Sequence, residues 1–200
     1  RSAAAVSSTA AKIARAATVA VPMIYVSHSV PEIARLADEV VLLAEGKCLA
    51  TGPVEEVMGR MDLKPHTGRY EAGAVIEATV RSHDAADQLT TLSFAGGELM
   101  VPQLAAAPGE RVRARIRARD VSIATQRPVG ISTLNILSGR VTAIREETGP
   151  IVDIQLVVGA TALMARITQR SLRDLDIRVS QEVYALVKAV SFDHRSTGYA

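Results

Sequence analysis

Residues 23–47, MIYVSHSVPEIARLADEVVLLAEGK, decide the fold of the first part of the chain, because three elements follow one another there. Met23 to Val26 is a short apolar run with β-branched and aromatic side chains, which predicts a strand. Ser29, with Glu32 three residues later, is a capping-box pattern that predicts a helix start. Apolar residues then recur at helical spacing, and Val40 to Leu43 predicts a buried strand. We expect a β-α-β unit of an open parallel sheet.

The same stretch resembles the C-terminal end of an ABC transporter ATPase domain. His28 at the strand-to-helix junction, a helix ending in Ala-Asp and the strand VVLLAEGK occur in the family's order, and Thr51 to Met58 (TGPVEEVM) resembles the turn and short helix that follow. In that family the histidine senses the γ-phosphate of ATP, so the resemblance gives His28 a catalytic-site role. A histidine ending a strand is also common in unrelated α/β proteins, and the whole motif at this spacing favours the ATPase interpretation.

The phosphate-binding parts of such an ATPase are absent from the sequence. The Gly46-Lys47 pair is followed by Cys48 and lacks the earlier glycine of a P-loop, and neither the acidic strand end for Mg²⁺ nor the family's signature helix occurs. The chain also starts at Arg1 and enters the pattern at its last strands. We therefore expect part of a longer subunit that does not hydrolyse ATP alone, with ATP and Mg²⁺ bound only in the full-length subunit.

Composition narrows the remaining classes of protein. The 200 residues are 48% hydrophobic, which allows more than one small domain with a core. A net charge of +2, no Trp and 3% aromatic residues argue against base stacking, so no nucleic acid is expected. Cys48 is the single cysteine and no metal-ligand spacing occurs, so a reducing cytoplasmic setting and no metal are predicted. No apolar run reaches membrane-spanning length, so any membrane link would go through a partner.

The chain divides by composition and periodicity. Residues 1–60 are assigned to the incomplete ATPase part, and an Ala/Ser-rich start that permits helix lacks the uninterrupted hydrophobic run of a signal peptide. Residues 61–73, with Pro65 and glycines, read as a linker. A β-barrel domain is expected at residues 74–193 and a tail at 194–200.

Short alternating segments fill the barrel domain, and turn signals such as Gly96-Gly97, Pro108-Gly109 and Gly149-Pro150 separate them. They form an internal repeat, about residues 74–125 and 131–193. VIEATV (75–80) aligns with VTAIRE (141–146), ELMVP with ALMAR, and ERVRARIRARDVSI with QEVYALVKAVSF, which places Arg117 opposite Lys188. The fold class expected is an α/β remnant followed by an all-β, OB-like di-barrel.

Five arginines alternate with small or apolar residues between Arg111 and Arg119. At a period of two they line one face of a single strand running from Arg111 to Ile123. A solvated outer face that also discourages edge pairing explains this pattern, and an anion-binding surface is the functional alternative.

A second resemblance enters in the barrel domain. ISTLN at Ile131, MARIT at Met164 and ALVKAVSF at Ala185 resemble the molybdate- or tungstate-binding Mop domain within the TOBE region of molybdate-importer ATPase subunits. The family holds the oxyanion, often across a subunit interface, with residues that correspond here to Ser132, Thr168, Ser171, Lys188 and Ala189. Hydroxyl and N–H donors with a cation suit a tetrahedral dianion. A turn-capping hydroxyl is the alternative for each serine.

One position departs from the family pattern. Leu134 stands where the family has an arginine, so a charge-assisted donor is lost. A weaker site, compensation by Arg166 or Arg170, or a domain that acts only as a structural dimer contact are the three consequences open at this point.

The two resemblances together imply the C-terminal, oxyanion-binding part of the ATP-binding subunit of a molybdate ABC importer. They imply a homodimer through the barrels, a membrane permease as partner, and a cytoplasmic location on the inner face of the membrane. The alternatives are an accessory TOBE domain of a sugar, polyamine or iron importer, and a free-standing molybdate store or sensor. The ATPase-like stretch around His28 counts against a store.

Overall fold

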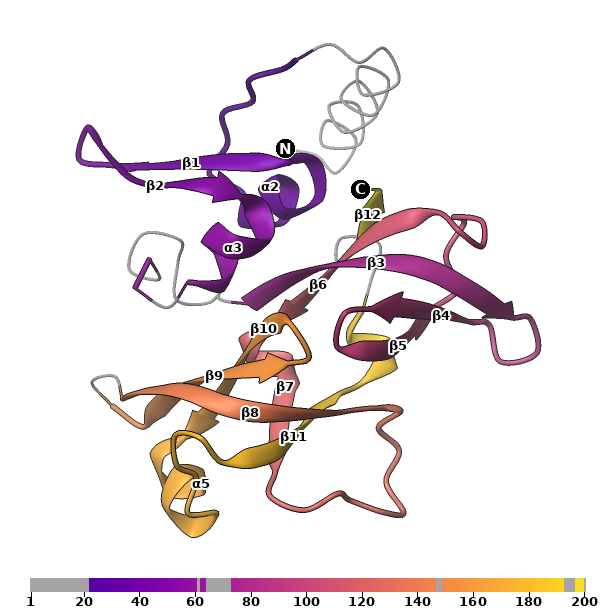
Figure 1. Ribbon diagram of the computed structural model, residues 1–200, viewed down its shortest axis with the longest axis vertical. Helices are drawn as coiled ribbons and strands as arrows, with labels where there is room; N and C mark the ends of the chain where they lie inside the picture. Colours follow the sequence, from indigo (N-terminus) through magenta and orange to yellow (C-terminus); the bar gives the residue numbers. More distant parts are fainter. Residues whose placement is uncertain (1–21, 61, 64–72, 147–148, 193–196, 200) are drawn as a thin grey trace.

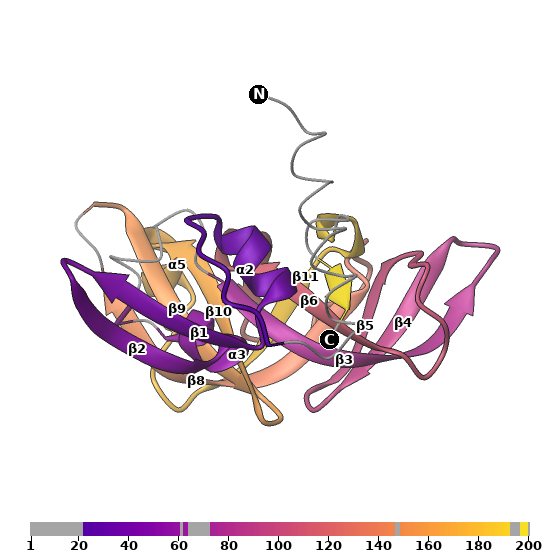
Figure 2. The ribbon, with the colours of Figure 1, turned by 90° about the horizontal axis from the view of Figure 1, so that it is seen from above.

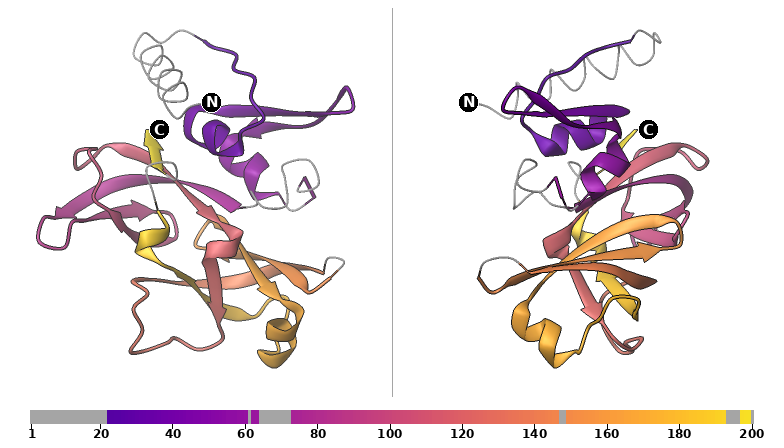
Figure 3. Two further views of the ribbon diagram at one scale, coloured as in Figure 1. Left: turned by 180° about the vertical axis from the view of Figure 1, so that it is seen from behind. Right: turned by 60° about the vertical axis from the view of Figure 1, so that its left-hand side comes forward.

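A computed structural model describes residues 22–60, 62–63, 73–146, 149–192 and 197–199 (Figure 1). A small N-terminal unit, residues 22–60, precedes two five-stranded antiparallel sheets. Figures 2 and 3 show the N-terminal unit on one side of the sheets, next to strands β3 and β6. An α/β start followed by a β domain is thus confirmed.

The N-terminal unit consists of two short helices and one hairpin. Its elements are α2 (Val30–Leu36), β1 (Glu39–Ala44), β2 (Lys47–Pro53) and α3 (Val54–Gly59). β1 and β2 pair antiparallel around Glu45-Gly46, both at positive φ, a backbone that suits the tight turn of a twisted hairpin. Val40, Val54 and Val57 form its core together with Val75 of the barrel, so the unit and the barrel share buried apolar surface.

Two expectations for this unit were wrong. Met23 to Val26 is not a strand, and Ile24 and Val26 are 97% and 84% exposed. No strand lies beside this run among the described residues, so its backbone groups have no ladder to join. The parallel pair expected between this run and Val40 to Leu43 is therefore absent, and β1 pairs instead with β2 in an antiparallel hairpin joined by two residues.

The barrel domain contains two copies of one three-stranded meander with additional strands. One sheet has the order β12-β6-β3-β4-β5 and the other β10-β9-β8-β11-β7. The strand bounds in the first sheet are β3 (Gly73–Asp84), β4 (Leu89–Phe94), β5 (Gly97–Pro102), β6 (Arg111–Arg117) and β12 (Thr197–Tyr199).

The strands of the second sheet are β7 (Val121–Ala124), β8 (Asn135–Glu146), β9 (Ile151–Val158), β10 (Thr161–Thr168) and β11 (Glu182–Val187). Helix α5 (Gln169–Asp174) and the 3₁₀ turns η1 (Ala118–Asp120) and η2 (Ala189–Ser191) complete the domain. One apolar core, including Leu92, Leu99, Leu156 and Leu163, spans both sheets.

The strand registers confirm the repeat and correct one segment of it. Val80 of β3 pairs with Leu92 in the first copy, and Val141 of β8 pairs with Leu156 in the second. Both β3 and β8 have a bulge just after that pair. Val80 therefore corresponds to Val141, and residues 75–80 align with 136–141 rather than with 141–146. The other alignments hold, because Arg117 and Lys188 both immediately precede a 3₁₀ turn. The correction is a shift of five residues, and the one-residue bulge in each strand is not visible in the alternation of the sequence.

The two copies exchange their last strands. After η1, strand β7 of the first copy leaves its own sheet and pairs with β11 of the second. After η2, strand β12 of the second copy pairs with β6 of the first. Each sheet is therefore completed by a strand from the other copy, which joins the two barrels into one body.

This exchange overturns the single strand expected from Arg111 to Ile123. The 3₁₀ turn η1 divides it into β6 and β7, which belong to different sheets. The solvated outer face is also wrong for two of its arginines, because Arg113 and Arg115 are buried. The residues expected as a tail, 194–200, include strand β12. Of the helices in the described residues, none combines the length and apolarity needed to cross a membrane.

Candidate anion-binding site

His28 lies in the extended segment just before α2, with its side chain exposed. Ser29 is the residue at the helix N-cap, but its side chain makes no capping bond, so the predicted capping box is wrong. Ser27 takes its place: its Oγ accepts the Ser29 backbone N–H at 3.0 Å and donates to Glu32 Oε2 at 3.0 Å. Tyr25 also donates to Glu32 at 2.8 Å. The hydrogen bond to Glu32 raises the pKa of the Tyr25 hydroxyl.

Ser132, Lys188 and Ala189 lie near the same end of two paired strands. Val187 at the end of β11 pairs with Asn135 at the start of β8, so the loop before Asn135 and the turn η2 after Val187 leave the sheet together. Ser132 and Lys188 are exposed, whereas Ala189 is buried. η2 also packs on β5. The structure thus brings these three predicted residues to one end of the barrel.

Thr168 and Ser171 form a separate pair at the start of α5. Thr168 Oγ1 accepts the Ser171 backbone N–H at 3.0 Å, and the two hydroxyls are 2.9 Å apart. Thr168 is the helix N-cap, so a capping role accounts for its hydroxyl. Figures 1 and 3 show α5 at the opposite end of the barrel from the bright-yellow turn η2 beside β5. One chain therefore does not bring the two groups of predicted residues together.

The arginines that were considered as substitutes for the missing one at Leu134 have other partners. Arg166 makes a two-point ion pair with Asp153, Nε to Oδ1 at 2.9 Å and Nη2 to Oδ2 at 3.1 Å. Asp153 is fully buried, so this pair is a structural element of the second sheet. Arg170 pairs with Asp174 within α5 at 3.2 Å.

The electrostatics at Lys188 favour an anion. Within the part of the chain that the structure describes, its ammonium group has no carboxylate or carbonyl partner. Exposed apolar side chains lie in the same turn and in the loop that contains Ser132: Val190 of η2 is 82% exposed, and Ile131 and Leu134 are about half exposed. A cation beside hydroxyls and apolar surface, with no paired carboxylate, can accept a small dianion together with backbone N–H groups.

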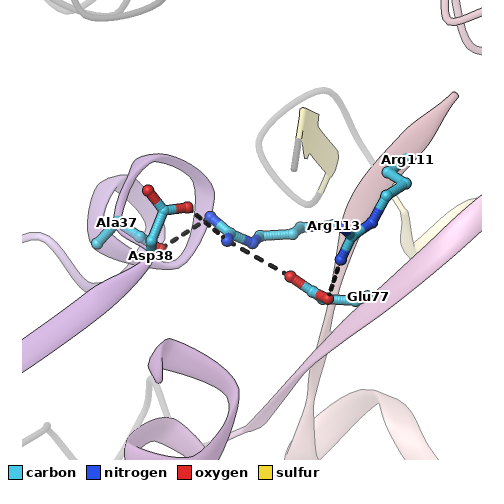
Figure 4. Close-up of polar contacts among 5 residues, drawn as sticks. All are labelled: Ala37, Asp38, Glu77, Arg111 and Arg113. Carbon is cyan, nitrogen blue, oxygen red and sulfur yellow. Dashed lines mark hydrogen bonds and ion pairs between the residues drawn. The ribbon is translucent and has the colours of Figure 1, made fainter. Parts of the chain in front are cut away.

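Sequence reasoning missed two polar clusters. Asn135, buried, bonds through its side-chain amide to the backbone of Met100 in β5. Arg113, buried in β6, reaches the end of α2 (Figure 4). The alternating arginines were a signal for the second cluster, but burial of one face depends on the N-terminal unit. No group of three or more His, Cys, Asp or Glu residues in the described ranges could hold a metal ion.

Comparison with known proteins places these observations in a family. Residues 131–192 match the TOBE domain. The chain is 50% identical over 178 residues to the molybdenum import ATP-binding protein ModC of Mesorhizobium japonicum, a match that covers 89% of this chain and 48% of that protein. ModC of Aromatoleum aromaticum is 47% identical over 171 residues, covering 86% of this chain and 45% of the relative. The chain spans about half the length of the curated relatives it matches.

A solved structure supports the barrel fold. The cytoplasmic molybdate-binding protein ModG, in a crystal form with molybdate bound, superposes with a TM-score of 0.56 at 23% identity, covering 63% of this chain and 95% of that one. At this identity the likeness concerns the fold. Along most of its length this chain is thus similar to about half of the molybdenum import ATP-binding proteins, and its residues 131–192 form a TOBE domain.

Proposed function

We propose that the barrel domain binds molybdate, through Ser132, Lys188 and the backbone at Ala189. The observation that carries the proposal is Lys188, an exposed cation without a described acidic partner, which leaves its sheet beside the loop that contains Ser132. N–H and O–H donors together with a cation bind a tetrahedral dianion. Leu134 contributes no donor, so we expect weaker binding than with an arginine there.

A second copy of the chain would complete the site. Thr168 and Ser171 lie at the other end of the barrel, so they can join Lys188 only from another copy. Apolar side chains flank both groups: Leu134 and Val190 near Lys188, and Ile151, the register partner of Thr168, beside α5. Two such faces on one molecule suit a closed two-fold dimer in which each face of one copy meets the other face of its partner. Tungstate, of the same shape and charge, would compete for the site.

The wider role is a proposal for the longer protein. In it, His28 would contact the γ-phosphate of ATP, with Mg²⁺ held by residues outside this chain, and the subunit would work on the cytoplasmic side with a membrane permease. The 50% identity to a molybdenum import ATP-binding protein supports this role. The barrel would then report the oxyanion concentration to the ATPase.

Titration calorimetry with molybdate tests the binding proposal, with tungstate as competitor and sulfate as the anion control. We expect heat with molybdate, and a loss of about tenfold or more in affinity for Lys188→Ala, because a charge-assisted contact contributes about 1.5–3 kcal/mol. Lys47→Ala is the matched control, since Lys47 is an exposed lysine on β2. No heat with the unsubstituted chain would overturn the proposal and leave a dimer-forming module.

Oligomeric state is measured on the same samples by sedimentation. A dimer whose molybdate affinity falls for both Lys188→Ala and Ser171→Ala supports a site shared between copies. Binding by a monomer, or binding that Ser171→Ala leaves unchanged, would restrict the site to Ser132, Lys188 and Ala189.

A further inference from the structure

Arg113 lies between the N-terminal unit and the barrel (Figure 4). Its Nη1 donates to the backbone carbonyl of Ala37 at 2.8 Å, and its Nη2 donates to Asp38 Oδ1 at 2.8 Å. On the barrel side, Nη2 is 3.5 Å from Glu77 Oε1, and Glu77 also pairs with Arg111 at 2.6 Å. One guanidinium thus holds acceptors from both parts of the molecule.

The Ala37 carbonyl connects Arg113 to the segment that carries His28. Ala37 is the C-cap of α2, a helix of seven residues. The same helix begins directly after Ser29, next to His28. At a rise of about 1.5 Å per residue, α2 is about 10 Å long, so this one short helix links the segment of His28 to the Ala37 carbonyl.

Strand β12 connects Arg113 to the candidate anion site. In the ladder between β12 and β6, Gly198 is the partner of Arg113. β12 is the next described strand after Lys188, Ala189 and the turn η2. Helix α2 also packs on β12. Strand β12, which follows the candidate anion site, and helix α2, which follows His28, therefore both contact β6 at Arg113.

The contacts of Arg113 allow two arrangements. The Arg113 side chain is 6% exposed, whereas that of Asp38 is 88% exposed, so water can replace the guanidinium at Asp38 at small cost. Glu77, on the neighbouring strand, would keep the buried charge paired if the contacts with α2 were lost. Nε of Arg113 is buried and makes no hydrogen bond to the described residues, so the contacts with α2 are made by Nη1 and Nη2 alone.

We infer that Arg113 is a positioning residue that couples oxyanion binding in the barrel to the segment carrying His28. In the engaged state it holds Ala37 and Asp38, and in the released state it pairs with Glu77 alone. Oxyanion binding at η2 orders β12 against β6 and favours the engaged state, in which α2 is held. This inference rests on the proposed function, because the oxyanion is the ligand that shifts the equilibrium.

Hydrogen exchange of the α2 amides, with and without saturating molybdate, tests the coupling in the full 200-residue chain. The Ile33 and Ala37 amides donate within α2, so their exchange reports its opening. We expect molybdate to slow exchange across α2 about fivefold or more, at the lower end of usual coupling factors. In Asp38→Ala the slowing should vanish while molybdate still binds, with an affinity lowered by no more than the coupling factor of about fivefold, because Asp38 lies outside the binding residues and coupling is reciprocal.

Two further variants separate coupling from loss of structure. Arg113→Lys keeps a cation but not the fork that reaches two acceptors, and we expect it to abolish the slowing. Arg111→Lys is the matched control, because Arg111 contacts Glu77 on the same strand face without touching α2, and it should retain the slowing.

The outcomes separate the two proposals. Molybdate that binds without slowing α2 exchange in the unsubstituted chain overturns the coupling alone. Equal slowing in Asp38→Ala and in the unsubstituted chain also overturns the role of Arg113. No calorimetric binding at all removes the oxyanion function, and the coupling with it.

Discussion

Asn135 and Met100 form a two-point hydrogen-bonded pair in which a side chain imitates a strand. Met100 N–H donates to Asn135 Oδ1 at 2.6 Å, and Asn135 Nδ2 donates to the Met100 carbonyl at 2.9 Å. Met100 belongs to β5 of the first copy and Asn135 begins β8 of the second, so the pair joins the two copies. Asn135 is buried, so these two hydrogen bonds replace the bonds that its amide group would make with water.

Replacement of Asn135 by leucine should therefore destabilise the protein. The substitution keeps the number and branching of the side-chain heavy atoms but leaves the N–H and C=O of Met100 without these bonds, at a cost of about 2–3 kcal/mol in the free energy of unfolding. Urea unfolding followed by circular dichroism measures it. Ser138→Ala, at an exposed position of the same strand, is the control and should change stability by less than about 0.5 kcal/mol. A loss in Asn135→Leu no larger than in the control would contradict the pairing.

Thr90 organises the loop after β5 through its hydroxyl. Thr90 Oγ1 accepts the Leu104 N–H at 3.0 Å and lies 2.9 Å from His83 Nδ1, while His83 Nε2 lies 3.0 Å from the Ala106 carbonyl. A carbonyl only accepts, so Nε2 carries the hydrogen, and Nδ1 of the neutral ring accepts from Thr90.

The isosteric change Thr90→Val removes both bonds at a fully buried position and should cost about 2–3 kcal/mol. Thr90→Ser keeps the hydroxyl and should lose much less. Thermal unfolding of the two variants side by side is the measurement. Equal losses would mean that the methyl group, rather than the hydroxyl, stabilises this position.

Asp153 and Arg166 should be energetically coupled, so that removing one of them lowers the free energy of unfolding more than removing both. Arg166→Met leaves the fully buried carboxylate of Asp153 without its two-point partner and should cost about 3–5 kcal/mol. In the double variant Asp153→Leu/Arg166→Met neither charge of this pair remains, so stability should partly recover. A double-mutant cycle in urea measures the coupling. Losses that simply add would show that the two side chains act independently.

Two hairpin turns, one from each copy, touch at the centre of the barrel domain. A Cβ at Gly159, between β9 and β10, would collide with the carbonyl oxygen of Ala95 between β4 and β5. Gly130 has a similar backbone, φ +66° against +59°, but open space around it. Both alanine variants therefore carry the strain of a left-handed conformation, about 1 kcal/mol, and only Gly159→Ala adds a clash with backbone.

We expect Gly159→Ala to lower the free energy of unfolding by about 2–4 kcal/mol and Gly130→Ala by about 1 kcal/mol. Equilibrium unfolding of both variants tests the difference. Equal effects would show that conformational strain alone accounts for the loss, and that the two turns do not constrain each other.

Much of the local structure could be predicted because it depends on short-range patterns. The strand at Val40 to Leu43, the helix after Ser29, most barrel strands and the correspondence of Arg117 with Lys188 follow from periodicity and turn residues. The failures have a shared cause. Met23 to Val26 has strand composition without a neighbouring strand among the described residues, and Arg113 of β6 has surface composition but is buried against the end of α2.

The sequence by itself determined the repeat, the division into an α/β part and a β domain, and the candidate residues of the anion site. Only the tertiary structure decided that the two copies exchange β7 and β12, that Ser132 and Lys188 lie apart from Thr168 and Ser171, and that Arg113 is buried between the two parts. The physical reason is that the alternation of a strand specifies which face is buried, whereas the choice of partner strand depends on contacts between residues far apart in the chain.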